Sequence, residues 1–502
     1  MMKSRWRSVA LVLILVLIAA ISFGCLRNEY IRCMGVRVIT PEQAAAYTDY
    51  AYQDLSSLLL MDGQPAAVDV EHSTLYISQN SAGKKTYRDL DGQLQISSGR
   101  YQLYFVLERE DLQLEQAMAQ NVPFRLLVTD GSTRYMEYDV IFTSLPVISL
   151  NGQMSHVDQE NREVMDGSFC LWSATDPVMQ QYAAKAFAVQ WRVRGRTSAV
   201  LLDKKSYKVS LTGKDLDLQG LGKSGDWILN SLGFDDTLLR EKLFMNLWND
   251  LTAETTHNYP MSKGEYVELV LNGEYSGIYL LQRRIDGKYL GLADEDILFK
   301  TTTYAASSLE GAYEIVYAKT SSEYAYAQMA DIYHGGGSDI LDINNLIDTN
   351  LFLQFAEALD NYAFKNMYHL LKYTAEGYRH YLIPWDTDMS FGLTWQEGVG
   401  LVYDYDSTVN GYAVRRETRA VPDIDADMAA RWSQLRTSML SQENINRYLE
   451  QELMLLQGSG AYVRNSQVWA ERHAGEDTLG NLYRFIGERL VWLDDYYANM
   501  NR

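Results

Sequence analysis

The segment DNYAFKNMYHLLKYTAEGYRHYLIPWDTDMSFG, from Asp360 to Gly392, holds the densest group of candidate catalytic residues in the chain. Asp360 precedes Asn366 by six residues, and a PWDTD turn 20 residues after Asn366 adds Asp386 and Asp388. In phosphoryl-transfer enzymes one carboxylate accepts the proton of the substrate hydroxyl, while an Asn and a second carboxylate hold Mg²⁺ against the ATP phosphates. The segment therefore predicts phosphoryl transfer that depends on ATP and Mg²⁺.

The composition is that of a globular protein. A chain of 502 residues is long enough for roughly two or three domains, each with its own core. Hydrophobic residues make up 47% of the chain and charged residues 22%, which excludes a disordered protein. The net charge of −20 argues against a nucleic-acid partner, because nucleic-acid phosphates attract clusters of Lys and Arg.

Residues 1–26 have the pattern of a targeting segment. Lys3, Arg5 and Arg7 precede the apolar run from Val9 to Ile21, which is the order of charges and apolar residues in a signal peptide. A small residue directly before Cys25 is similar to a bacterial lipoprotein cleavage site, at which that cysteine would carry the lipid. We therefore expect lipidation of Cys25.

Two alternatives to the lipoprotein remain open. The apolar run of about 18 residues is just long enough for an uncleaved membrane anchor. A cleaved, freely secreted form is the third interpretation. All three place the body of the chain in an extracytoplasmic location, and the first two tether it to the cell membrane. The chain has three cysteines and no paired Cys or His spacing, so we expect neither a disulfide framework nor a structural zinc site.

Hydrophobic patterns divide the rest of the chain into a β-rich N-terminal domain, 27–149, and a second domain, 150–502. The boundary is placed near Pro146. In the first domain we expect one helix, from Pro41 to Leu60, because a proline lies near its start and an apolar face returns at helical spacing. Short apolar or alternating runs separated by polar turns predict strands at Tyr101 to Leu107, Phe124 to Val128 and Tyr138 to Phe142.

The second domain begins with strands and ends with helices. An Asn272-Gly273 turn between alternating apolar runs predicts a hairpin from Tyr266 to Leu281. A second hairpin is expected from Met367 to Ile383, ending at Pro384. Further strands are expected at 189–193 and 207–211, and helices at 235–251, 346–359, 427–440, 442–457 and 478–498. This order predicts an α+β fold with the bilobal layout of kinases, a β-rich N-lobe followed by a helical C-lobe.

Five pieces of the sequence, taken in order, resemble the CotH family of bacterial kinases, known from spore coats and other bacterial surface proteins. The resemblance covers residues of about 150 to 500 and leaves the N-terminal domain outside it. It implies an atypical protein-kinase-like fold that binds ATP and phosphorylates Ser or Thr of surface or coat proteins. The pieces are RGRTS (194–198), KKSYK (204–208), LLR (238–240), LNGEYSGIYLLQRRID (271–286) and the opening segment.

The resemblance implies roles for the acidic segment. Asp360 is similar to the family's catalytic base, and Asn366 to its metal-holding Asn. The spacing of six residues departs from kinase catalytic loops, in which the Asn follows after about five. Asp386 is favoured as the second metal ligand, with Asp388 as its competitor or as a further ligand.

Residues that would contact ATP are less well defined by the sequence. Lys205 and Lys208 lie on or beside a candidate strand where a phosphate-pairing lysine is expected, and spacing does not choose between them. Arg194 begins a motif similar to a phosphate-contacting turn, and Lys365 is a candidate for neutralising phosphate charge. Gln282 stands where adenine would meet the hinge, at a position that often holds Glu in the family.

Two classes of function follow. The first is an active extracytoplasmic protein kinase whose partner is a protein substrate on the cell surface or spore coat. The second is a catalytically weak kinase-like scaffold or binding module. A zinc hydrolase and a serine hydrolase are not expected, because neither an HExxH nor a GxSxG pattern is present.

Overall fold

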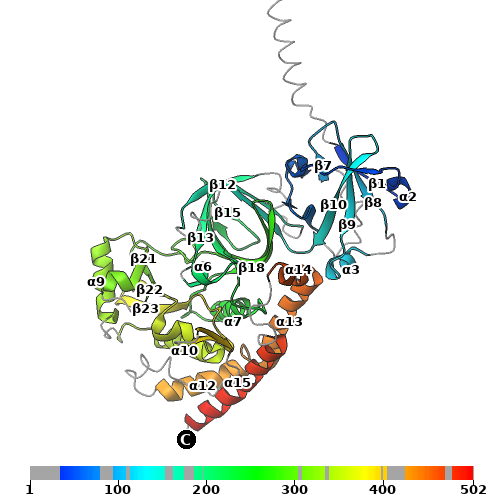
Figure 1. Ribbon diagram of the computed structural model, residues 1–502. Helices are drawn as coiled ribbons and strands as arrows, with labels where there is room; N and C mark the ends of the chain where they lie inside the picture. The colour runs from blue at the N-terminus through cyan, green and yellow to red at the C-terminus, as the bar shows by residue number, and fades with distance from the viewer. Residues whose placement is uncertain are drawn as a thin grey trace, which may run out of the picture. The chain divides into compact units, whose positions relative to one another are not determined.

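The computed structural model describes residues 34–79, 94–108, 113–152, 162–174, 186–195, 197–303, 308–333, 339–396, 400–403, 424–469 and 478–500. These residues form a mixed α+β protein, as the sequence predicted at that level (Figure 1). They divide into two compact units: residues up to 150 with 170–186 and 270–275, and residues 151–169 with 187–269 and 276–502. The predicted targeting segment and Cys25 lie outside the described residues. Within the described part, no helix has the length and apolar character needed to cross a membrane.

The first unit is built on a mixed β-sheet with the strand order β4-β3-β7-β1-β8-β9-β10-β6-β5, and β2 pairs with β10. The three strands predicted in this region are confirmed as β8, β9 and β10. Their inward side chains, among them Leu103, Leu126 and Val140, are fully buried in the core. The strands are β1 (Met34–Ile39), β2 (Asp49–Tyr50), β3 (Leu59–Met61), β4 (Gln64–Pro65), β5 (Val68–Asp69), β6 (Thr74–Ser78), β7 (Leu94–Ile96), β8 (Gln102–Val106), β9 (Phe124–Thr129) and β10 (Arg134–Thr143).

The predicted helix from Pro41 to Leu60 is wrong beyond its first turn. Helix α2 (Pro41–Ala44) begins with a capping box, in which Thr40 and Gln43 exchange hydrogen bonds, but it ends at Ala44. The apolar residues that followed at helical spacing enter the sheet instead, through β3, which pairs with β7. The start of the helix was therefore predicted correctly. The structure of the residues that follow depends on pairing between strands that are distant in the sequence.

A closed barrel has the strand order β11-β12-β13-β14-β17-β19-β18, which the sequence did not predict. The hairpin between β18 and β19 is confirmed, and its turn residues Asn272 and Gly273 have φ of 52° and 78°, as a tight hairpin turn requires. The strands expected at 189–193 and 207–211 are confirmed as β13 and β14. The barrel strands are β11 (Val147–Gly152), β12 (Met165–Trp172), β13 (Phe187–Arg194), β14 (Ser206–Leu211), β17 (Asp226–Asn230), β18 (Gly264–Leu271) and β19 (Glu274–Arg283).

Helix α7 (Arg240–Glu254) starts five residues later than the acidic pattern suggested. Asp235 precedes it in a turn, and the Oδ2 atom of this carboxylate accepts a hydrogen bond from the backbone N–H of Arg240 at 2.8 Å. The carboxylate of Asp235 therefore satisfies one of the free N–H groups at the start of the helix, and its negative charge favours the positive end of the helix dipole.

The remainder of the second unit contains a four-stranded sheet, β21-β20-β22-β23, and a group of helices. The hairpin of β22 (Met367–Thr374) and β23 (Gly377–Pro384) is confirmed, and Pro384 is its last paired residue. Helices α10, α12 and α15 pack on one another (Figure 1). The other elements are β15 (Leu216–Asp217), β16 (Lys223–Ser224), β20 (Ile297–Thr301), β21 (Tyr313–Tyr317), β24 (Leu393–Gln396), β25 (Gly400–Tyr403), α6 (Thr197–Leu201), α8 (Leu309–Ala312), α9 (Ser322–Tyr333), α10 (Ile343–Ala356), α12 (Ile424–Arg436), α13 (Gln442–Gly458), α14 (Ala461–Val468) and α15 (Leu479–Met500).

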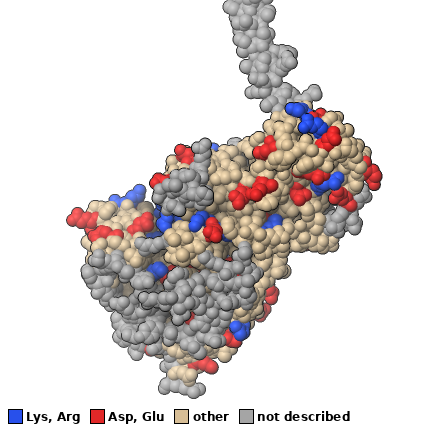
Figure 2. Space-filling model, in the orientation of Figure 1, with Lys and Arg blue, Asp and Glu red and all other residues tan. Residues whose placement is uncertain are grey.

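The helices expected near 346–359, 427–440, 442–457 and 478–498 are confirmed as α10, α12, α13 and α15, with shifted ends. Helix α14 was missed, because eight residues are too few for an apolar period to stand out. Acidic side chains are spread over the face shown in Figure 2, with basic side chains among them, in keeping with the negative net charge.

Candidate active site

Asp360 and Asn366 meet at the end of a short 3₁₀ helix, η3 (Leu359–Phe364), which follows α10. The Nδ2 atom of Asn366 donates a hydrogen bond to Oδ2 of Asp360 at 2.6 Å, and the ammonium of Lys365 pairs with Oδ1 of Asp360. Asn366 has a left-handed backbone with φ of 54°, which turns the chain into β22. The longer spacing between Asp360 and Asn366 is thus compatible with direct contact.

Asn361 joins this turn to the PWDTD segment. Its Nδ2 atom donates hydrogen bonds to the carbonyl oxygens of Asn366, at 3.1 Å, and of Trp385, at 2.9 Å. The backbone N–H of Trp385 also donates to the carbonyl of Asn366, at 3.0 Å. Asp386 follows directly, with φ of 58°, a conformation that is costly for a residue other than glycine and is typical of functional sites. One buried carboxamide therefore holds the two candidate metal ligands, Asn366 and Asp386, close in space.

The carboxylates of this region influence one another. Burial raises the pKa of Asp360, although the pairing with Lys365 opposes the rise. Burial, and then the charges of Asp386, Glu241 and Asp360, raise the pKa of Asp388 well above its ordinary value. Four acidic groups thus lie near enough to repel one another, and a cation bound among them would relieve that repulsion.

Glu241 at the start of α7 was not predicted as a site residue. Its Oε2 atom accepts hydrogen bonds from the backbone N–H of Thr387, at 2.8 Å, and from the Thr387 hydroxyl, at 3.1 Å. Its Oε1 atom accepts one from Nε2 of Gln282 at 3.1 Å. Burial and the charge of Asp386 raise the pKa of Glu241 to about 7. Glu241 therefore ties the turn between Asp386 and Asp388 to the barrel strand β19 and to helix α7.

Cationic side chains face the acidic group. Lys300 on β20 lies over the Trp385 ring at 5.0 Å, and Arg194 at the end of β13 lies over the same ring at 5.7 Å. Burial and the neighbouring Arg194 lower the pKa of Lys300 to about 8, while the charge of Asp386 opposes that change. Sequence reasoning found Arg194 but missed Lys300, which has no motif around it and reaches the site because β20 pairs with β22.

The lysines chosen from the sequence make other contacts. The ammonium of Lys205 donates to the carbonyls of Ala199, at 2.9 Å, and Leu202, so it caps the carbonyl end of α6. Lys208 is half-exposed and pairs with Asp226 at 3.4 Å. Gln282 is fully buried, and Lys365 is paired with Asp360. The charge of Asp386 raises the pKa of Lys300, so this lysine lies within electrostatic reach of the acidic residues.

The oxygen atoms at the site suit magnesium better than a metal that takes all of its ligands from the protein. In the described part of the chain, no three Asp, Glu, His or Cys side chains form a group that could hold a metal alone. Mg²⁺ usually takes one or two carboxylates and completes its shell with water and phosphate oxygens. Asn366 uses its amide N–H on Asp360, which leaves its oxygen available, and Asp386 supplies a carboxylate. These residues fit Mg²⁺ bound together with a nucleotide.

A comparison with known protein families identifies the family of this chain. Acidic, carboxamide and cationic side chains thus gather in one region of the second unit. The family model described as CotH kinase protein matches residues 191–493, which is more than half of the chain. This chain therefore belongs to the CotH family. A comparison with curated proteins found no match.

Proposed function

We propose that the chain is an active protein kinase of the CotH type, which transfers the γ-phosphate of ATP to Ser or Thr hydroxyls of surface or coat proteins. The observation that carries this proposal is the convergence of Asp360, Asn366 and Asp386 through the hydrogen bonds of Asn361. Family membership supports it. Lys300 and Arg194 add positive charge on the side of the site where phosphates would lie.

Each residue has a role that follows from its surroundings. Asp360 accepts the proton of the substrate hydroxyl, and its raised pKa favours this because a general base works best when its pKa lies near the operating pH. Lys365 and Asn366 hold one carboxylate oxygen each, so the orientation of Asp360 is fixed. Asn366 and Asp386 hold the metal ion, and Asp388 is the alternative ligand. Mg²⁺ held by these residues would supply positive charge against the negative charge that develops during transfer.

The same proposal extends to the fold and location. The barrel with α7 would form the first lobe of a kinase-like arrangement, and the sheet of β20 to β23 with α10, α12 and α15 would form the second. ATP would lie against Arg194 and Lys300. The body of the chain would be tethered outside the cytoplasmic membrane through Cys25 or the apolar run before it. Loss of lipid labelling in Cys25→Ala supports the lipoprotein, and unchanged membrane association favours the anchor.

The test is ³²P transfer from ATP to a basic, Ser-rich protein, paired with titration of Mg²⁺–ATP into the full chain. Binding should also raise the thermal midpoint, because a ligand at 100 times its Kd stabilises a fold by about 2.7 kcal/mol. We expect both binding and transfer. If the wild-type chain binds no Mg²⁺–ATP, the kinase proposal fails and the scaffold interpretation replaces it. Binding without transfer indicates a catalytically weak member.

A further inference from the structure

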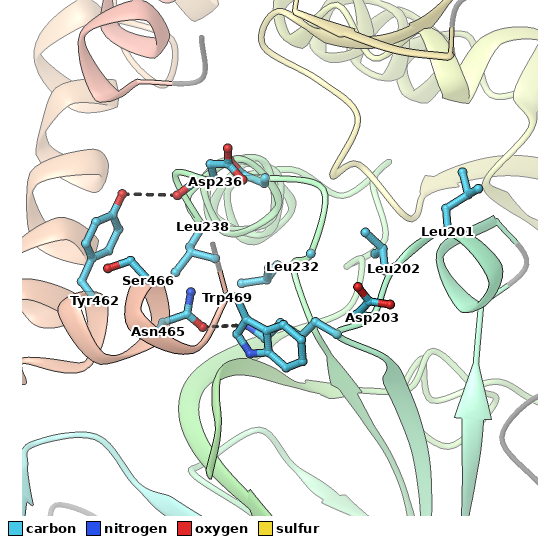
Figure 3. Close-up of a pocket in the computed structure, with 13 residues that line it drawn as sticks. Leu201, Leu202, Asp203, Leu232, Asp236, Leu238, Tyr462, Asn465, Ser466 and Trp469 are labelled. Atoms are coloured by element: carbon cyan, nitrogen blue, oxygen red, sulfur yellow. Dashed lines mark hydrogen bonds between the residues drawn. The ribbon is translucent and has the colours of Figure 1, made fainter. Parts of the chain in front are cut away.

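A pocket of about 260 Å³ lies in the second unit, away from the acidic residues described above (Figure 3). Helix α14 forms one side with Tyr462, Asn465 and Ser466. The segments 201–204 and 232–238 form the other side. The volume is just below the roughly 300–1,000 Å³ of pockets that hold drug-sized ligands. It therefore suits a molecule of about the size of an amino acid.

Lys204 lines this pocket and is almost completely buried, with 5% of its surface exposed. Its ammonium donates to the carbonyl oxygen of Ile278 at 2.5 Å and to Oδ1 of Asn465 at 2.8 Å. It also lies over the ring of Tyr279 at 5.0 Å. All of these partners are neutral. A lysine ammonium has three N–H donors, so one donor remains for a further acceptor.

A buried cation with neutral partners alone is costly, because burial removes hydration that no opposite charge replaces. The pKa of Lys204 reflects this, since burial lowers it to about 7. A carboxylate placed on the remaining donor would offset the cost. It would also form a charge-assisted hydrogen bond, which is stronger than a bond between neutral groups.

The rest of the pocket wall carries opposite charge and apolar surface. Asp203 is exposed, and Asp236 is half-buried. Asp235 is already used by Arg240. The side chains of Leu202, Leu232 and Leu238 add apolar surface, which would contact the hydrocarbon part of a ligand. The carboxylate of Asp203 disfavours a phosphate-rich ligand and favours one that bears an amine.

We propose that this pocket binds a small zwitterionic molecule, an aliphatic amino acid or the equivalent part of a dipeptide. Its carboxylate accepts a hydrogen bond from Lys204, its ammonium faces Asp203, and its side chain contacts the leucines. The proposal does not depend on kinase activity, because none of these residues belongs to the acidic site.

The first experiment is isothermal titration calorimetry of the full chain with L-leucine. Two analogues serve as controls: 4-methylpentanoate, which lacks the amine, and 3-methylbutylamine, which lacks the carboxylate. We expect L-leucine to bind and each analogue to bind about tenfold more weakly or less, because each loses one charge-assisted contact. Absence of L-leucine binding, or equal binding of 4-methylpentanoate, overturns the proposal.

Variants locate the binding in the pocket. Lys204→Met keeps the length of the side chain and removes the donor, so L-leucine affinity should fall about tenfold or more. Ser466→Trp places a large ring at the exposed rim without disturbing Lys204, and it should also weaken binding. Lys214→Met, an exposed lysine outside the pocket, is the matched control and should bind as the wild type does. Circular dichroism checks that each variant is folded.

Two outcomes contradict the assignment even if L-leucine binds. Unchanged affinity in a folded Ser466→Trp variant would place the ligand elsewhere. Displacement of L-leucine by Mg²⁺–ATP would make the pocket part of the nucleotide site. If the chain binds L-leucine but not Mg²⁺–ATP, the pocket assignment stands and the kinase proposal fails, so the two failures are distinguishable.

Discussion

Lys300 and Lys204 belong to the same unit, and burial lowers the pKa of both, yet their surroundings differ. Lys300 lies among charges of both signs, with Arg194 lowering its pKa and Asp386 and Glu314 raising it. Lys204 has only neutral hydrogen-bond partners. Burial alone therefore does not determine what a buried lysine can bind, because the charges of its neighbours differ. A lysine in a charged group suits a phosphate that arrives with a metal, whereas an isolated one suits a single carboxylate.

The strongest test of the charged region is Asp360→Asn. We expect phosphoryl transfer to fall by about 10²–10⁴-fold, because general-base catalysis contributes roughly that factor. Affinity for Mg²⁺–ATP should stay close to that of the wild type, since the carboxamide keeps the size of the side chain. The ³²P assay measures the first quantity and nucleotide titration the second. Full transfer activity in this variant would remove Asp360 from the mechanism.

Asp386→Ala should fail in a different way. The metal loses an anionic ligand, so Mg²⁺–ATP affinity should fall by about tenfold or more, with the loss smaller for ATP without metal. Asp388→Ala is the matched comparison on the same turn. If Asp388→Ala loses nucleotide affinity and Asp386→Ala does not, the kinase proposal survives with the metal ligand reassigned.

Lys300→Met tests the lysine that the structure adds. We expect Mg²⁺–ATP affinity to fall about tenfold, because a charge-assisted contact with phosphate is lost. Lys205→Met is compared with it, since Lys205 was the candidate from sequence but its ammonium contacts backbone carbonyls. Nucleotide titration of both variants decides between them. A loss confined to Lys205→Met would restore the sequence-based assignment.

The pH dependence of the free energy of unfolding tests the environment of Lys204. The folded-state pKa of Lys204 is about 7 and the ordinary value is 10.5. Between these values the unfolded chain binds more protons, so the free energy of unfolding rises with pH. Relative to Lys204→Met, the wild type should therefore gain stability from about pH 7 to about pH 10, by at most about 1.4 kcal/mol per pH unit.

Thermal unfolding of both proteins without ligand, at matched pH values, measures this difference. Lys214→Met should follow the wild-type profile, because that lysine is exposed. If the stability of the wild type and of Lys204→Met changed with pH in the same way, the pKa of Lys204 would have its ordinary value. The pocket would then lack the buried, unusually acidic ammonium on which the proposal depends.

The acidic segment could be predicted because its chemistry is local. Asp360, Asn366 and Asp386 lie within 27 residues, and two hairpin strands between them were recognisable from their alternation. Lys300 could not be found in this way. It stands in the strand ILFKT with no catalytic residue nearby in sequence, and its place depends on the pairing of Lys300 with Tyr368. Whether these residues perform the proposed chemistry stays a prediction.

The same distinction between local and distant contacts applies to the fold. Hairpins and long helices were predictable from periodicity, because each depends on neighbours in sequence. Closure of the barrel was not, since it requires β18 to meet β11, far apart in the chain. The helix predicted from Pro41 to Leu60 failed for this reason. Its spacing suggested a helix, but Leu59 pairs with Ile96 of a distant strand.

The hydrogen bonds of Asn361 have a consequence for how the site opens. Because this one side chain binds the backbones of both Asn366 and Trp385, the two segments can separate only if at least one of its bonds breaks along with the direct bond between Trp385 and Asn366. The Trp385 amide, which donates to Asn366, should therefore exchange its hydrogen with solvent only through a concerted local opening. Asn366 and Asp386, the two candidate metal ligands, would then lose their mutual arrangement in the same opening event.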